Sequence, residues 1–266
     1  MKYIFFISLV WLTTFAQAQT IQTDRPQFAV SGNLQPVKTF NVETGVAATF
    51  VDKEHLLMNY NVTSFRIGMM PLMEMNVTLR APGYIDRLAE VHQAGFASPR
   101  LGLKVRMKEK TETSKLGLAF VGSTSINFGS KQFKDTKILP AFRVAMDIDA
   151  TEKINLRVNY GVQWLEDKSI LDPEDNPVIN PFIVLALNSN FVITEKTTLF
   201  AEYFANLKYN NLRNDHYIHA GCLFKVADNL QIDISGGAGL SPRTPRGFVN
   251  LGFSGWWPKK NFATQD

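Results

Sequence analysis

The chain has 266 residues, of which 45% are hydrophobic, and its mean hydropathy is −0.08. A single cysteine excludes an internal disulfide framework and a multi-cysteine metal site. The 28 Lys and Arg residues only slightly outnumber the 24 Asp and Glu residues and form no basic stripe, so no nucleic-acid partner is expected.

The first 18 residues have the features of a cleaved signal peptide. Lys2 supplies a positive charge, an apolar stretch runs from Ile4 to Phe15, and Ala16-Gln17-Ala18 fits the small-x-small cleavage pattern. We therefore expect residues 1–18 to be removed, Gln19 to become the mature N-terminus, and the protein to be exported.

Residues 19–38 show little alternation of apolar and polar side chains. The segment contains Thr23-Asp24-Arg25-Pro26 and Pro36, and both prolines disfavour regular structure. The sequence predicts an ordered coil here instead of a strand.

A period of two dominates the chain from Thr39 to Trp257. Between Ile154 and Trp164, for example, every second side chain is apolar, and polar residues or glycine lie between them. Successive side chains of a strand point to opposite faces, so each segment of this kind has one apolar and one polar face. An amphipathic helix would need apolar spacings of three and four, which these segments lack.

Twelve strands follow from this pattern. In the second, the apolar parity shifts near Ser64, where a β-bulge would restore the facing of the side chains. The eighth is apolar on both faces in its first half. The predicted ranges are 39–51, 55–70, 73–85, 97–108, 114–127, 138–150, 154–166, 180–193, 197–209, 214–226, 230–241 and 246–257.

The strands favour a membrane-spanning barrel over a soluble periplasmic sandwich or a lipocalin-like barrel. Ten or more residues suit a tilted membrane span, and aromatic residues such as Phe40, Trp164 and Trp257 lie near strand ends, as an interfacial girdle requires. The sequence predicts an all-β fold: an antiparallel transmembrane β-barrel of about twelve strands over residues 39–257, integral to the bacterial outer membrane.

Short and long connections tend to alternate along the chain. Outer-membrane barrels have short periplasmic turns and longer outer loops. We therefore expect both termini, including a tail of residues 258–266, to lie in the periplasm. The connection at 52–54 is short where this scheme requires a long one. The tight turns are 71–72, 151–153, 194–196 and 228–229, and the longer connections include 128–137 and 167–179.

Short motifs along most of the mature chain resemble those of one bacterial family. They are Thr23 to Pro26, Phe40 to Gly45, Ala97 to Lys104, Thr198 to Tyr203 and Asn229 to Asp233. The chain resembles outer-membrane proteins described as transporters, or as the MetA pathway of phenol degradation. The resemblance implies an outer-membrane barrel that transports small, hydrophobic or aromatic solutes. The chain departs from the family's motifs at two places. Ala97-Ser98 stand where the family tends to have Gly-Asp before the proline, and the chain extends beyond Trp257.

By parity, the polar faces line the barrel interior. Twelve strands enclose more space than the eight of a side-chain-filled barrel and less than the strands of open porins. We expect a passive or gated conduit with a narrow or plugged lumen; a closed structural barrel is the alternative. The candidate lumen-lining residues are Glu43, Arg66, Glu74, Arg80, Lys104, Arg106, Arg143, Asp147, Arg157, Glu202, Lys225 and Asp233.

The coil at 19–38 is the candidate plug. We expect it to fold against or into the periplasmic mouth and restrict passage. Asp24 and Arg25 would then pair with interior charged residues, where reduced water strengthens such contacts. A disordered periplasmic leader is the alternative.

Catalytic and metal-binding patterns are weak. His219 has polar parity and Ser235 lies on the neighbouring strand, but no Gly-x-Ser-x-Gly elbow occurs. Asp172, Glu174 and Asp175 suit a solvated acidic loop better than a Ca²⁺ site. We predict no enzyme activity, no cofactor and no metal; a lipid-modifying enzyme is the alternative. The expected partners are outer-membrane lipid and lipopolysaccharide, the outer-membrane assembly machinery and a small solute.

Overall fold

A computed structural model describes residues 23–111, 113–171, 177–208, 214–242 and 244–258. The expected signal peptide, the acidic residues at 172–175 and the tail beyond Pro258 lie outside these ranges. The described residues contain no helix long and apolar enough to cross a membrane. Their strands are β1 (Thr39–Phe50), β2 (His55–Met70), β3 (Met73–Asp86), β4 (Val91–Ala94), β5 (Arg100–Lys108), β6 (Leu116–Ser125), β7 (Pro140–Asp149), β8 (Ile154–Leu171), β9 (Pro177–Thr194), β10 (Thr197–Lys208), β11 (Asn214–Ala227), β12 (Leu230–Gly239) and β13 (Gly247–Pro258).

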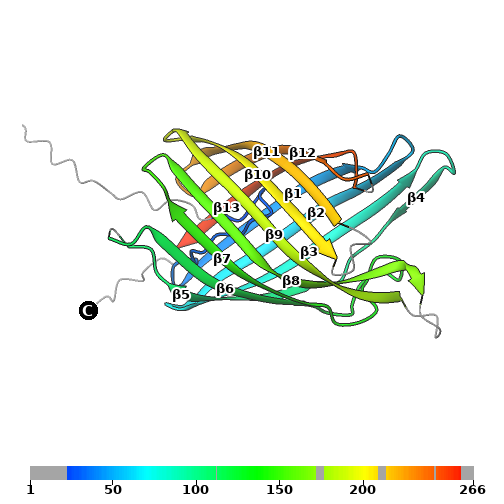
Figure 1. Cartoon of the computed structure of the whole chain (residues 1–266), viewed down its shortest axis with the longest axis horizontal. Coiled ribbons are helices and arrows are strands. Elements are labelled where there is room, and N and C mark those ends of the chain that lie inside the picture. The colour runs from blue at the N-terminus through cyan, green and yellow to red at the C-terminus, as the bar shows by residue number, and fades with distance from the viewer. Residues whose placement is uncertain (1–22, 112, 172–176, 209–213, 243, 259–266) are drawn as a thin grey trace, which may run out of the picture.

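Twelve of these strands close into an antiparallel barrel (Figure 1). Each strand pairs with its neighbours in the chain, except that β3 pairs with β5, and the barrel closes where β1 pairs with β13. In this closing seam, Thr39 lies opposite Pro258 and Phe50 lies opposite Gly247. The predicted antiparallel barrel is confirmed.

The small strand β4 was not predicted. It pairs with Gly83–Asp86 of β3 at the rim, outside the closed ring of twelve strands. Its four residues, Val91 to Ala94, are too few to show a period of two, so the alternation could not indicate it.

The two ends of the barrel differ. We call the end where β1 begins and β13 finishes the terminal end, and the opposite end the loop end (left and right in Figure 1). The tight turns at 71–72, 195–196 and 228–229 lie at the terminal end, whereas the connection at 126–139 lies at the loop end. The short connection at 51–54 also lies at the loop end, so it remains an exception to the alternation of lengths.

The distribution of side chains is the reverse of that in a soluble barrel. In the β7–β8 hairpin, the outward Phe142 and Tyr160 are 41% and 57% exposed, whereas the inward Asn159 is 0% exposed. The largest fully buried side chains include Lys104 and Glu43. A lipocalin-like barrel keeps its apolar face inside, so this arrangement fits a barrel whose outer face meets lipid.

The bulge expected near Ser64 lies slightly earlier in β2. The register of β2 shifts between Asn59 and Asn61, opposite Pro82 and Ala81 of β3. Proline has no N–H to donate to the ladder, so Pro82 suits a position at a bulge. Beyond the bulge, Arg66 points into the lumen, as the parity predicted.

Strands β8 and β9 are longer than expected. They remain paired beyond the predicted ends, as far as Leu171 and Pro177, across a register shift after Asp167. This extension has no clear alternation, because Asp167 and Lys168 follow one another and Pro177 begins the returning strand.

Candidate functional site: a lumen crossed by the N-terminal segment

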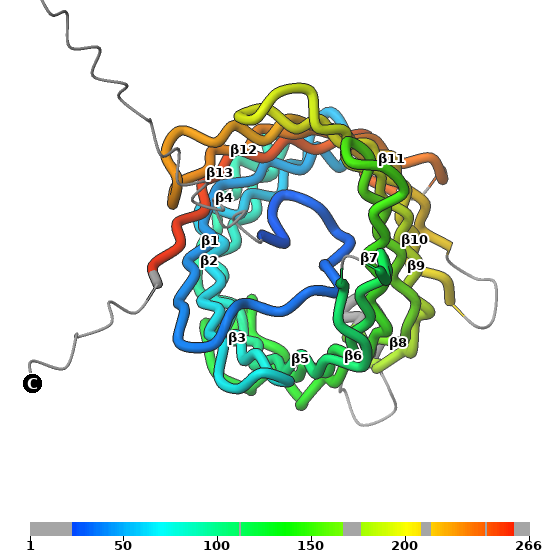
Figure 2. Tube along the Cα trace, turned by 90° about the vertical axis from the view of Figure 1, so that its left-hand side faces the viewer, coloured from blue at the N-terminus to red at the C-terminus, as the bar shows by residue number. Residues whose placement is uncertain are grey.

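Residues 23–38, which we call the lumen segment, lie inside the barrel. Figure 2, viewed from the terminal end, shows this blue segment crossing the interior before it joins β1. Lys38 donates its main-chain N–H to the Gly68 carbonyl at 2.9 Å, which fixes the segment at the point where it enters β1. Lys38 has a positive φ of 62°. The tight bend there turns the chain from the lumen into the wall.

The main chain of the lumen segment is held by carboxylates of the wall. Glu202 on β10 accepts the N–H groups of Phe28 and Ala29 at 2.9 and 2.7 Å. Glu74 on β3 accepts the N–H of Gln35 at 2.8 Å. In the ring of twelve strands, β3 and β10 are separated by five strands in each direction. The segment is therefore bound to opposite walls and spans the lumen.

A neutral amide provides a further main-chain anchor. The Asn159 side chain on β8 accepts the Val30 N–H and donates to the Val30 carbonyl, both at 2.9 Å. An amide can satisfy a peptide group in both directions, which a carboxylate cannot do. The sequence placed Asn159 on the polar face, but nothing in the local pattern indicated this contact.

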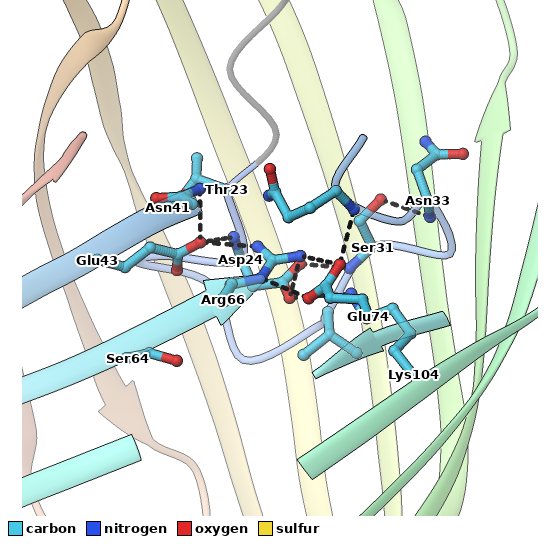
Figure 3. Close-up of polar contacts among 12 residues, drawn as sticks. Thr23, Asp24, Ser31, Asn33, Asn41, Glu43, Ser64, Arg66, Glu74 and Lys104 are labelled. Carbon is cyan, nitrogen blue, oxygen red and sulfur yellow. Dashed lines mark hydrogen bonds and ion pairs between the residues drawn. The ribbon is translucent and has the colours of Figure 1, made fainter. Parts of the chain in front are cut away.

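Asp24 lies in a compact ion-pair cluster (Figure 3). Its carboxylate is 3.2 Å from Arg66 Nη2 and 3.1 Å from Lys104 Nζ. Arg66 also contacts Glu43 and Glu74, each at 2.7 Å. One residue of the lumen segment thus completes a network built on β1, β2, β3 and β5.

The electrostatic environment of Asp24 favours its charged form. Burial acts to raise the pKa of this carboxyl, but the positive charges of Arg66, Lys104 and Arg157 outweigh it and hold the pKa well below its ordinary value. Asp24 also accepts the Ser31 N–H at 2.8 Å, which closes a loop within the segment.

Arg25 and its neighbour Thr23 bridge the closing seam. The guanidinium of Arg25 lies 3.2 Å from Asp233 on β12, and its main-chain N–H donates to Glu43 on β1 at 3.0 Å. The Thr23 hydroxyl lies 3.1 Å from the Ser254 hydroxyl on β13. These contacts connect the segment to the strands on both sides of the seam.

Glycines make room for the lumen segment. Gly45 and Gly252 face each other across the seam, and a Cβ at either position would collide with the Arg25 guanidinium. A Cβ at Gly68 would collide with the main-chain carbonyl of Pro36. A Cβ at Gly45 would also collide with the main-chain carbonyl of Leu251. A flexible side chain can move away from such a contact, whereas a main-chain atom cannot, so Gly45 and Gly68 are more demanding positions than Gly252.

An aromatic cluster anchors the middle of the segment. The Phe28 ring stacks on Phe204 with 4.5 Å between centroids, and Phe204 stacks on Tyr217 at 4.7 Å. Ala29 is fully buried beside Ala186 of β9. This packing explains why β9 is apolar on both faces: one face meets lipid and the other meets the lumen segment.

Two cavities lie on opposite sides of the lumen segment. The one at the terminal end, about 460 Å³, is lined by Thr23, Ser31 and Asp149 among others. The one at the loop end, about 630 Å³, is lined by Asp24, Val30 and Arg143 among others. Because the segment contributes residues to both linings, it lies between the two cavities.

The predicted lumen-lining residues differ in depth and in contacts. Glu43, Arg66, Glu74, Lys104, Asp147, Glu202 and Asp233 are buried. Arg106 and Lys225 lie at the terminal end and pair with nearby Glu109 and Asp228. Arg157 lies 3.3 Å from Asp147 and donates to the Gln27 side chain at 2.6 Å. Arg80, Arg100 and Arg143 line the loop-end cavity; Arg100 was not among the predicted residues.

The Ser-His pair considered from the sequence does not form. His219 Nδ1 lies 2.9 Å from Glu202, and the ring packs against Phe200 with 4.9 Å between centroids. Ser235 instead accepts a hydrogen bond from Asn250 at 3.1 Å. In the described part of the chain, no group of three or more His, Cys, Asp or Glu side chains is placed to hold a metal ion.

Comparison with known proteins gives the family. Residues 23–256 match the family described as "Putative MetA-pathway of phenol degradation". The chain belongs to this family. The match begins at Thr23, so it includes the lumen segment as well as the barrel, and it confirms the resemblance carried by the sequence motifs. A search of curated proteins found no match.

Solved structures with the same fold are outer-membrane channels and porins. The COG4313 outer membrane channel from Pseudomonas putida F1 has a TM-score of 0.65 at 12% identity, covering 88% of this chain and 100% of that chain. The NanC porin has 0.57 at 10% identity, and the KdgM porin 0.55 at 8%, each covering 81% of this chain and 98% of its own. At such identities the likeness establishes the fold, a bacterial outer-membrane barrel, and supports an outer-membrane location.

Proposed function

We propose that this protein is a non-enzymatic outer-membrane conduit for small solutes, and that the lumen segment controls passage through it. The observation that carries the proposal is the attachment of the segment to opposite walls, through Glu74 on β3 and Glu202 on β10. A segment bound in this way separates the terminal-end cavity from the loop-end cavity, so a solute can cross only when it moves.

The chemistry of attachment suits a movable partition. The segment is held by hydrogen bonds and ion pairs to polar groups of the wall, such as Glu43 and Asn159. When the segment is displaced, water can replace these contacts, because cavities border the segment on both sides.

The orientation completes the proposal. We infer that the terminal end faces the periplasm, since the tight turns lie at that end and outer-membrane barrels have short periplasmic turns. The loop-end cavity then opens toward the cell exterior. Phe28 and Phe204 line a further cavity of about 330 Å³, which supports passage of small hydrophobic or aromatic compounds beside the aromatic cluster.

Conductance in planar bilayers tests the proposal. The full mature chain should conduct little, and a chain lacking residues 19–38 should conduct clearly more, because the partition is absent. Undetectable conductance from both proteins would contradict the conduit. Equal, large conductance from both would contradict control by the segment. Hydrolysis of outer-membrane lipid by the full chain, lost in His219→Ala, would instead support an enzyme.

A further inference from the structure

Three arginines on one side of the loop-end cavity form no close ion pair with the wall. Arg80, Arg100 and Arg143 lie on β3, β5 and β7 and all line this cavity. Among the described residues, no carboxylate lies within ion-pair distance of any of the three. This is unusual for the lumen, where Arg25, Arg66 and Arg157 all have carboxylate partners.

The three positive charges lie close enough to act on one another. Arg80 repels the charge of Arg100, and Arg100 repels the charge of Arg143, which Asp24 and Glu202 attract from a distance. Holding like charges together costs energy unless an anion binds between them. The arrangement is therefore most favourable when a negative ligand occupies the cavity.

Partial contacts hold two of the guanidinium groups in place and occupy few of their N–H donors. Arg100 donates to the Ser123 hydroxyl at 3.3 Å, and Arg143 donates to the Phe28 carbonyl at 3.4 Å. Arg143 also lies over the Phe28 ring, 4.8 Å from its centroid. A guanidinium carries five N–H donors, so each arginine keeps several for a ligand.

The acidic residues of the same cavity offset this charge only in part, because they have other partners or lie beyond ion-pair distance. Asp24 and Glu43 are already paired with Arg66 and with main-chain N–H groups of the lumen segment. Glu166 accepts hydrogen bonds from Thr136. Asp135 attracts Arg100 but lies beyond ion-pair distance. The face formed by Arg80, Arg100 and Arg143 therefore remains net positive.

We propose that these three arginines form a binding site for small organic carboxylates, and that the conduit is selective for such anions. Selectivity for such anions deepens the proposed function and rests on it. Guanidinium groups match carboxylates in planar, bidentate geometry. A cavity of about 630 Å³ lies within the usual size range for small-ligand sites.

Binding can be measured without any conductance. Purified full-chain protein in detergent is titrated with sodium benzoate and, separately, with neutral benzamide of the same shape, using ligand-observed NMR. We expect benzoate to bind and benzamide not to bind. Replacing Arg80, Arg100 and Arg143 together by Gln should abolish benzoate binding. Each single replacement should weaken it by about tenfold, the factor that one charged hydrogen bond supplies.

Arg106→Gln is the matched control, since Arg106 is a lumen arginine at the terminal end that already pairs with Glu109. Benzoate binding should be unchanged in this variant. An equal loss in Arg106→Gln would show general charge attraction and overturn the site, as would equal binding of benzamide or undiminished binding by the triple variant. Arg80→Gln keeps the test valid if the triple variant does not fold, because Arg80 is exposed.

Different experimental results would contradict the binding site and the conduit. Benzoate binding with no conductance from any form of the protein would leave the site standing and contradict the conduit. Conductance that rises on removal of residues 19–38, with no benzoate binding and no preference for anions in the reversal potential, would leave the conduit standing and contradict the site.

Discussion

The main-chain N–H of Ala29 donates to the Glu202 carboxylate across 2.7 Å, and Glu202 also contacts His219 at 2.9 Å. One wall carboxylate thus fixes both the lumen segment and the histidine beside the aromatic cluster. Hydrogen bonds to charged groups contribute about 1.5–3 kcal/mol each when buried, so this position should be sensitive to loss of charge.

Glu202→Gln should loosen the lumen segment. The amide has one acceptor oxygen, whereas the carboxylate accepts the N–H groups of Phe28 and Ala29 on separate oxygens. We expect more frequent channel openings in planar bilayers, with normal membrane assembly. Glu195→Gln, in the turn between β9 and β10, is the control and should behave as the unmodified chain. Identical single-channel records for Glu202→Gln and the control would refute this role.

Gly68→Ala should displace the end of the segment. The added methyl group would collide with the Pro36 carbonyl, a main-chain atom that can move only if the segment moves. Gly122→Ala is the matched control, because its nearest neighbour atom would lie 3.7 Å away, an ordinary contact distance. The measurement uses a Cys222→Ala background in which a cysteine replaces Val37. This cysteine should react faster with a thiol reagent when Gly68→Ala is added, and at an unchanged rate when Gly122→Ala is added. No difference between the two glycine variants would argue against the predicted collision.

Asp24→Asn should weaken docking of the segment at neutral pH. It removes the carboxylate that pairs with Arg66 and Lys104. The pKa of Asp24 is depressed in the docked segment, so its contribution is present above the free carboxyl pKa of about 3.9 and is lost only as pH falls toward the docked value. We therefore expect the unmodified chain to stay closed at pH 7 and pH 5 alike, and Asp24→Asn to conduct more at both. Opening of the unmodified chain at pH 5 would contradict this.

Arginine substitutions at adjacent positions of β8 should separate the lipid face from the lumen face. Val158→Arg places a charge on the lipid face, which costs about 2–4 kcal/mol near mid-membrane, and should prevent stable assembly. Asn159→Arg points inward, so the barrel should assemble, but the anchor to Val30 is lost and conductance should rise. Migration on gels before and after heating reports assembly. Equal failure of both variants would refute the assignment of faces.

Much of the barrel could be predicted because lipid and lumen impose opposite demands on alternate residues. Phe142 and Arg143 illustrate this, since their order alone places one outside and the other inside. The short strand β4 could not be predicted, as four residues carry no period. The apolar inner face of β9 looked anomalous because its partner, Ala29, is far away in sequence.

The contacts of the lumen segment were less predictable than the strands. The absence of alternation and the prolines at 26 and 36 indicated coil, and the charges of Asp24 and Arg25 suggested pairing with interior residues. A coil has no register, however, so nothing in the sequence selects Glu202 or Asn159 as the groups that bind it. Arg100 was missed although it lies within the predicted strand 97–108 and shares the parity of Lys104 and Arg106, so the alternation alone could have indicated it.

The contacts at the closing seam have a consequence for assembly. Thr39 and Pro258 come from opposite ends of the barrel sequence, so bringing β1 and β13 together carries the largest loss of chain entropy in the fold. Thr23 and Arg25 reach Ser254, Glu43 and Asp233 from the inside of that seam. Because the lumen segment joins strands on both sides of the seam, we expect a chain that lacks it to close its barrel more slowly.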